Sequence, residues 1–101
     1  MTEHAVIIAF RYGSTNLESL FELEDQLVEA ISEAGVGEYD GNEIAKDGSD
    51  GTLYMYGPDA DRLLQVVEPI VRACSFMKGA RMRRRYGSAQ SGANEIVSTI
   101  E

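Results

Sequence analysis

The stretch HAVIIAFRY, residues 4–12, decides the fold, because its β-branched and aromatic residues favour a strand over a helix. Successive side chains of a strand point to opposite faces, so this strand has two different sides. The heavier side, which we expect to face the core, consists of Val6, Ile8 and Phe10. The lighter side consists of Ala5, Ile7, Ala9 and Arg11.

A helix is predicted to follow this strand, because the next apolar residues recur at helical spacing up to about Ala34. Thr15 with Glu18 fits a capping box at its start. Gly35 fits the left-handed conformation that often ends a helix. The apolar stripe consists of Leu17, Leu20, Phe21, Leu27, Val28, Ile31 and Ala34.

Two strands are predicted next, over residues 37–47 and 52–56, joined by a turn over 47–51 that is rich in Asp and Gly. Gly41, in the middle of the first of them, indicates a bulge. In the second, Tyr54 and Tyr56 alternate with the apolar residues.

Residues 57–101 are predicted to hold one more helix and one or two strands. Asp59 is a typical N-cap for a helix that runs to about Cys74. Pro69 removes one backbone hydrogen bond, so we expect a kink or two short helices. A strand over 80–86, a loop over 87–94 and a short fifth strand over 95–100 complete the chain.

The order β-α-β-β-α-β over residues 1–101 predicts a single ferredoxin-like domain, an α+β sandwich with two helices on one face of a four-stranded antiparallel sheet. Right-handed crossovers would place the first and third strands side by side in the centre, and we expect them to be parallel. The short fifth strand would extend this sheet. Because many unrelated functions share the fold, architecture alone predicts no activity.

Composition narrows the classes of partner. The chain has 101 residues and a net charge of -8, which disfavours nucleic acids and anionic membranes as general partners. Cys74 is the only cysteine, so no internal disulfide can form, and a cytoplasmic location is expected. No apolar stretch reaches the length of about 20 residues that a membrane-spanning helix needs.

The basic residues are concentrated near one strand. Five of the nine lie at Lys78, Arg81, Arg83, Arg84 and Arg85, whereas residues 1–77 carry four basic and fifteen acidic side chains. Alternation places part of this cluster on the sheet face away from the helices. The candidate binding residues on this open face are Arg11, Tyr54, Tyr56, Arg81, Arg83 and Arg85. Arg84 breaks the alternation, and the sequence does not decide whether it faces the core or an edge.

Several functions could use such a face. Arg and Tyr are enriched at protein contacts, which favours a non-enzymatic module that forms a homodimer, or binds another protein, through the open face or an edge strand. The acidic row on the first helix could also dock a basic protein. Aromatic rings beside arginines are typical of RNA-binding sheets, but Asp50-Gly51-Thr52 does not fit their motif, so nucleic acid is an unlikely partner.

Two alternatives remain. One is a nucleic-acid or small-anion binder that uses the strand Arg81–Arg85, and the other is a small-molecule enzyme with a Tyr/Arg pocket. His4 begins a strand, and Cys74 lies on an apolar stripe, so neither is typical of a catalytic residue. We predict no cofactor, because the chain has neither a phosphate loop nor a dinucleotide-binding glycine pattern. No metal is predicted either, because Pro58 stands where a calcium loop beginning at Asp47 needs its bidentate acid.

Overall fold

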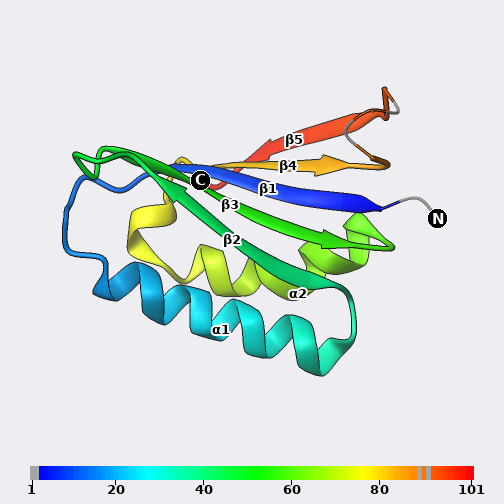
Figure 1. Ribbon diagram of the computed structural model, residues 1–101, viewed down its shortest axis with the longest axis horizontal. Coiled ribbons are helices and arrows are strands. Elements are labelled where there is room, and N and C mark those ends of the chain that lie inside the picture. The colour runs from blue at the N-terminus through cyan, green and yellow to red at the C-terminus, as the bar shows by residue number, and fades with distance from the viewer. Residues whose placement is uncertain (1–2, 89, 91) are drawn as a thin grey trace.

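The computed structural model describes residues 3–88, 90 and 92–101. Part of the predicted loop, at Ala89 and Ser91, therefore lies outside the described residues. The chain forms two layers, a five-stranded sheet and two helices that cover one of its faces (Figure 1). The ferredoxin-like α+β fold and its short fifth strand are confirmed.

The sheet has the strand order β2-β3-β1-β4-β5. Its strands are β1 (His4–Arg11), β2 (Glu38–Ile44), β3 (Asp50–Gly57), β4 (Arg81–Arg85) and β5 (Glu95–Thr99). The first and third strands lie side by side in the centre, as expected, but they are antiparallel, so the predicted parallel pairing is wrong. The crossover through the first helix makes β2 run in the direction of β1, and the hairpin then reverses β3.

The first helix, α1, spans Glu18–Ala34 and begins later than predicted. Its N-cap is Leu17, which has no capping side chain, so the capping box of Thr15 and Glu18 is wrong. The Asn16 Oδ1 accepts the Glu18 backbone N–H instead, at 3.0 Å. Gly35 ends the helix in the left-handed conformation, with a φ of 64°, as predicted.

The β2–β3 hairpin forms one side of the sheet. Its register shifts between Tyr39 and Gly41, so the bulge predicted at Gly41 is confirmed. Tyr39 ties this edge strand to α1, because its hydroxyl donates to a carboxylate oxygen of Glu24. Burial first, and then the Glu24 carboxylate, raise the pKa of the Tyr39 phenol far above its ordinary value.

The second helix, α2, spans Ala60–Arg72, and a short 3-10 helix, η1 (Ser75–Met77), follows it. Asp59 is the N-cap, and its Oδ1 accepts the backbone N–H groups of Asp61 and Arg62 at 3.0 and 3.3 Å. Pro69 lies within a single helix, so the prediction of two short helices is wrong. The helix tolerates Pro69 near its C-terminal end, where few intrahelical bonds remain.

The core lies between the sheet and the two helices. Val6, Ile8 and Phe10 face it, as predicted, and all three are nearly inaccessible to solvent. Leu53, Met55 and Met82 join them from the neighbouring strands, and α1 and α2 add Leu20, Leu27, Ile31, Leu63 and Val67. The opposite face of the sheet is not covered by any helix and contains the candidate site (Figure 1).

Candidate functional site: the open sheet face

Strand register brings all six predicted site residues to the open face of the sheet. Ala5, Ile7 and Ala9 of β1 pair with Tyr56, Tyr54 and Thr52 of β3 on one side. The same three β1 residues pair with Arg85, Arg83 and Arg81 of β4 on the other side. Arg11 pairs with Asp50 at the end of β1. The face therefore has a row of tyrosines, a central row of small apolar residues and a row of arginines.

Two of the three residues of the central row, Ala5 and Ile7, are buried although they lie on the sheet face away from α1 and α2. Ala5 is 0% exposed and Ile7 is 7% exposed. Directly opposite residues of an antiparallel pair lie about 4.5–5.5 Å apart at Cβ, so the flanking tyrosines and arginines lie close enough to shield them. Ala9, where β3 contributes only Thr52, is exposed. The long side chains beside Ala5 and Ile7 thus form a low cover over an apolar strip.

Tyr54 and Tyr56 of β3 lie beside the central row. Both are partly exposed. Burial first, and then the nearby Glu43 carboxylate, raise the pKa of the Tyr54 phenol above its ordinary value. Glu43 belongs to β2 and pairs with Thr52, so it lies on the same face. Tyr54 therefore stays protonated throughout the neutral pH range.

The open-face arginines of β4, which are Arg81, Arg83 and Arg85, differ in their polar contacts with the rest of the protein. The Arg83 Nε lies 3.9 Å from a carboxylate oxygen of Glu95 on β5, and both side chains are about half exposed. The Arg85 Nε donates to the Gly87 carbonyl at 2.7 Å. Arg81 is exposed, and no ion pair to it is found in the described part of the chain. The arginine row is consequently only loosely tied to the rest of the protein.

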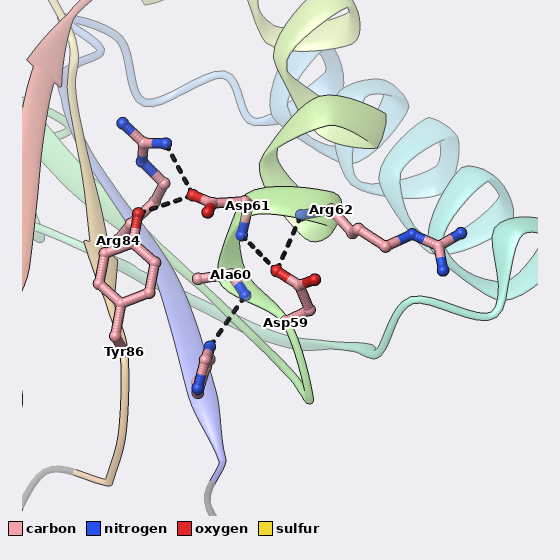
Figure 2. A network of polar contacts seen from close by, with 7 residues as sticks. Asp59, Ala60, Asp61, Arg62, Arg84 and Tyr86 are labelled. Atoms are coloured by element: carbon pink, nitrogen blue, oxygen red, sulfur yellow. Dashed lines mark hydrogen bonds and ion pairs between the residues drawn. The ribbon is translucent and has the colours of Figure 1, made fainter.

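Arg84 lies on the helix side of the sheet, which resolves the ambiguity left by the sequence. It pairs with Val6, a core residue, and its guanidinium Nη1 donates to Asp61 Oδ1 at 2.9 Å. The Tyr86 hydroxyl donates to the same oxygen at 2.6 Å. Figure 2 shows both side chains pointing toward Asp61 in the first turn of α2. Arg84 is therefore part of the contact between sheet and helix and not of the open face.

The electrostatics of this contact follow from the same bonds. The Tyr86 hydrogen bond first, and then Arg84, hold the pKa of the Asp61 carboxyl below its ordinary value. The bond to Asp61 in turn raises the pKa of the Tyr86 phenol. Nearby, His4 Nδ1 accepts the Ala60 backbone N–H at 3.1 Å. His4 thus provides an acceptor for one backbone N–H group in the first turn of α2.

A groove with a volume of about 650 Å³ lies at the end of the open face where β1 ends and β4 begins. Arg11 and Arg81 line it together with Lys78, which comes just before β4. Sequence reasoning did not include Lys78 in the site, although it belongs to the same basic cluster. The remaining lining residues are Ala9, Phe10, Asp50, Gly51, Thr52 and Gly79.

Three further observations concern the tyrosines, Cys74 and metal-binding groups. The groove that contains Arg11 and Arg81 is lined by no tyrosine, so the Tyr/Arg pocket of the enzyme alternative does not form there. Cys74 is partly buried against the core, and burial raises the pKa of its thiol, which disfavours the reactive thiolate. Within residues 3–88, 90 and 92–101, no group of three or more His, Cys, Asp and Glu side chains could hold a metal ion.

Comparisons with known proteins identify no function for this chain. No protein-family model, no curated protein and no solved structure matches the chain. In the part of the chain that the structure describes, neither helix is long and apolar enough to cross a membrane. Any assignment of function must therefore come from the open face itself.

Proposed function

We propose that the protein is a self-associating module in which two copies pack open face to open face around a twofold axis that runs along β1. The observation that carries this proposal is the order of the three rows. Tyrosines lie on one side of the central apolar row and arginines lie on the other, at the same heights along the strands.

A twofold axis parallel to β1 exchanges the two outer rows. Each copy then places Tyr54 and Tyr56 over Arg83 and Arg85 of the other copy. A guanidinium over an aromatic ring is a favourable pairing, worth about 0.5–2 kcal/mol depending on desolvation. An axis perpendicular to the strands would instead oppose arginine to arginine, so this geometry selects one of the two simple arrangements.

The centre of the proposed contact is apolar and would exclude water. The axis passes over Ile7, so Ile7 of each copy and the tyrosine and arginine side chains that shield it face those of the other copy, with Ala5 beside them. A neutral Tyr54 ring, kept protonated by its raised pKa, keeps its face available to a cation. Aligned sheets pack about 10 Å apart, a spacing that Tyr and Arg side chains can fill.

Pairing of edge strands is the rival mode of self-association. β5 is an edge strand, and its Ile96 and Val97 are 48% and 57% exposed. β5 contains only five residues, which limits the hydrogen bonds that a partner strand could make. The open face offers complementary charge and aromatic rings in addition to apolar area, and we favour it for that reason.

Sedimentation equilibrium across a concentration series tests the proposal. The native chain is expected to reach twice the monomer mass, and Tyr54→Arg is expected to weaken association at least tenfold because it opposes arginine to arginine. The double variant Tyr54→Arg/Arg83→Tyr restores one ring and one cation in each pair, so it should recover association. Arg83→Glu should also weaken association, because it removes the cation that faces Tyr54 of the other copy. Arg62→Glu, at an exposed position of α2, makes the same change of charge away from the open face and is its matched control.

Three results would contradict the proposal. A chain that stays monomeric at every concentration excludes self-association. A dimer that is unaffected by Tyr54→Arg but dissociated by Ile96→Lys is held by the β5 edge, because Ile96 pairs with Arg84 and lies on the side of β5 away from the open face. A dimer that Arg62→Glu weakens as much as Arg83→Glu responds to net charge alone.

A further inference from the structure

We infer that the groove lined by Arg11, Lys78 and Arg81 is a binding site for the phosphate group of a small phosphorylated molecule. This inference goes beyond self-association, because the groove belongs to a single chain and extends past the three rows. Lys78 and Gly79, on the connection from η1 to β4, form the part of its wall that lies outside the sheet.

The first argument is that three cations are gathered without internal counterions. The protein has seventeen acidic and nine basic side chains, so acids are plentiful. Arg72, Arg83 and Arg84 each have a carboxylate within 4 Å. Among the described residues, no such ion pair is found for Arg11, Lys78 or Arg81. Like charges brought together without partners repel, and an anion in the groove removes that repulsion.

The second argument is the charge of the lining. The only acid among the lining residues is Asp50, which pairs with Arg11 across β1 and β3. One carboxylate against three cations leaves an excess that matches a dianion rather than a chloride. A phosphate monoester carries a charge between about -1.5 and -2 at neutral pH.

The third argument is the kind of donor present. Guanidinium groups donate two parallel hydrogen bonds to phosphate oxygens, and a lysine ammonium adds a compact point charge. Thr52 contributes a hydroxyl to the lining. Ala9, which is exposed, adds an apolar contact for the organic part of the ligand. The volume of about 650 Å³ falls within the range of about 300–1,000 Å³ that is typical of small-molecule sites.

Titration with inorganic phosphate at pH 7.5 and constant ionic strength, followed by NMR shifts of backbone amides, tests the inference. Saturable shifts are expected at residues 9–11, 50–52 and 78–81. Arg11→Ala, Lys78→Ala and Arg81→Ala should each weaken binding about tenfold or more, because each removes a charge-assisted contact. Arg62→Ala, a cation outside the groove, is the matched control.

Asp50→Asn distinguishes the inference from misfolding. It removes the carboxylate of the lining, so it should tighten phosphate binding several-fold, whereas a misfolded variant would bind phosphate more weakly. Binding should also persist in the Tyr54→Arg variant, which separates this inference from the proposed dimer. Three results of the phosphate titrations would overturn it: no saturable shifts, equal losses in Arg62→Ala, or weaker binding in Asp50→Asn. Preferential binding of a single-stranded oligonucleotide that depends on Arg83 and Arg85 would overturn it in favour of a nucleic-acid face.

Discussion

Ile7 and Ile8 are consecutive residues of β1, and both are nearly inaccessible to solvent, but different layers cover them. Ile8 lies in the core between the sheet and the helix layer, among aliphatic and methionine side chains. Ile7 is shielded only by the long side chains of the neighbouring strands. Low solvent exposure therefore has two causes in this sheet. On one face the residues are packed in the core, and on the other they are shielded only by flexible side chains that can move. The following predictions test that distinction.

The largest difference is expected between Ile8→Ala and Ile7→Ala. Removal of the Ile8 side chain leaves a cavity in the packed core, so the free energy of unfolding should fall by about 3–4 kcal/mol. The flexible side chains around Ile7 can collapse into the space, so Ile7→Ala should cost about 1 kcal/mol. Urea denaturation at low protein concentration measures both. Equal losses would show that the open face is packed as firmly as the core.

Asp59→Ala should destabilise the helix layer without affecting the open face. The Asp59 carboxylate accepts two backbone N–H groups at the start of α2, and loss of such a cap costs about 1 kcal/mol. The mass at sedimentation equilibrium should stay that of the native chain under conditions where both proteins are folded. A shift to monomer would mean that association depends on the helices.

Arg84→Ala should lower the thermal midpoint more than Arg83→Ala does, although the two arginines are neighbours on β4. Arg84 bonds Asp61 at 2.9 Å with a largely shielded guanidinium, whereas Arg83 and Glu95 are exposed and 3.9 Å apart. Exposed pairs of the second kind contribute between about 0 and 1 kcal/mol. Calorimetry of the two variants compares them directly. The reverse order would place Arg83 in the structural contact.

The smallest effect is expected in the dependence of stability on pH. The folded-state pKa of Asp61 lies below its unfolded value, so the unfolded chain binds more protons in the window between the two. The stability contributed by Asp61 is present above the unfolded pKa and is lost as the pH falls through the folded pKa. Asp61→Asn should therefore flatten the acid limb of the stability curve. An unchanged acid limb would contradict the assigned hydrogen bonds.

Much of the fold could be predicted from sequence, because its signals are local. The alternation of Val6, Ile8 and Phe10 depends only on the pleat of one strand, and the conformation of Gly35 depends only on its own backbone. The direction of β3 relative to β1 was predicted wrongly because it depends on how the whole hairpin reverses the chain. The start of α1 was misplaced because Asn16 competes with Thr15 for the same backbone N–H groups.

The candidate site shows the same division. Alternation alone brought Arg11, Tyr54, Tyr56, Arg81, Arg83 and Arg85 to one face. The groove could not be predicted, since Lys78 reaches it from a connection whose path is set by η1. Arg84 was ambiguous because its partner, Asp61, is distant in sequence and lies across the two layers.

The central position of β1 also has a consequence for biosynthesis. The ribosome makes this strand before either of its neighbours, β3 and β4, at roughly 5–20 residues per second. Until β4 emerges, β1 exposes apolar side chains, and the backbone N–H and C=O groups along at least one of its edges have no hydrogen-bond partner. A chain truncated between β3 and β4 would keep one edge of β1 unpaired and would be prone to aggregate.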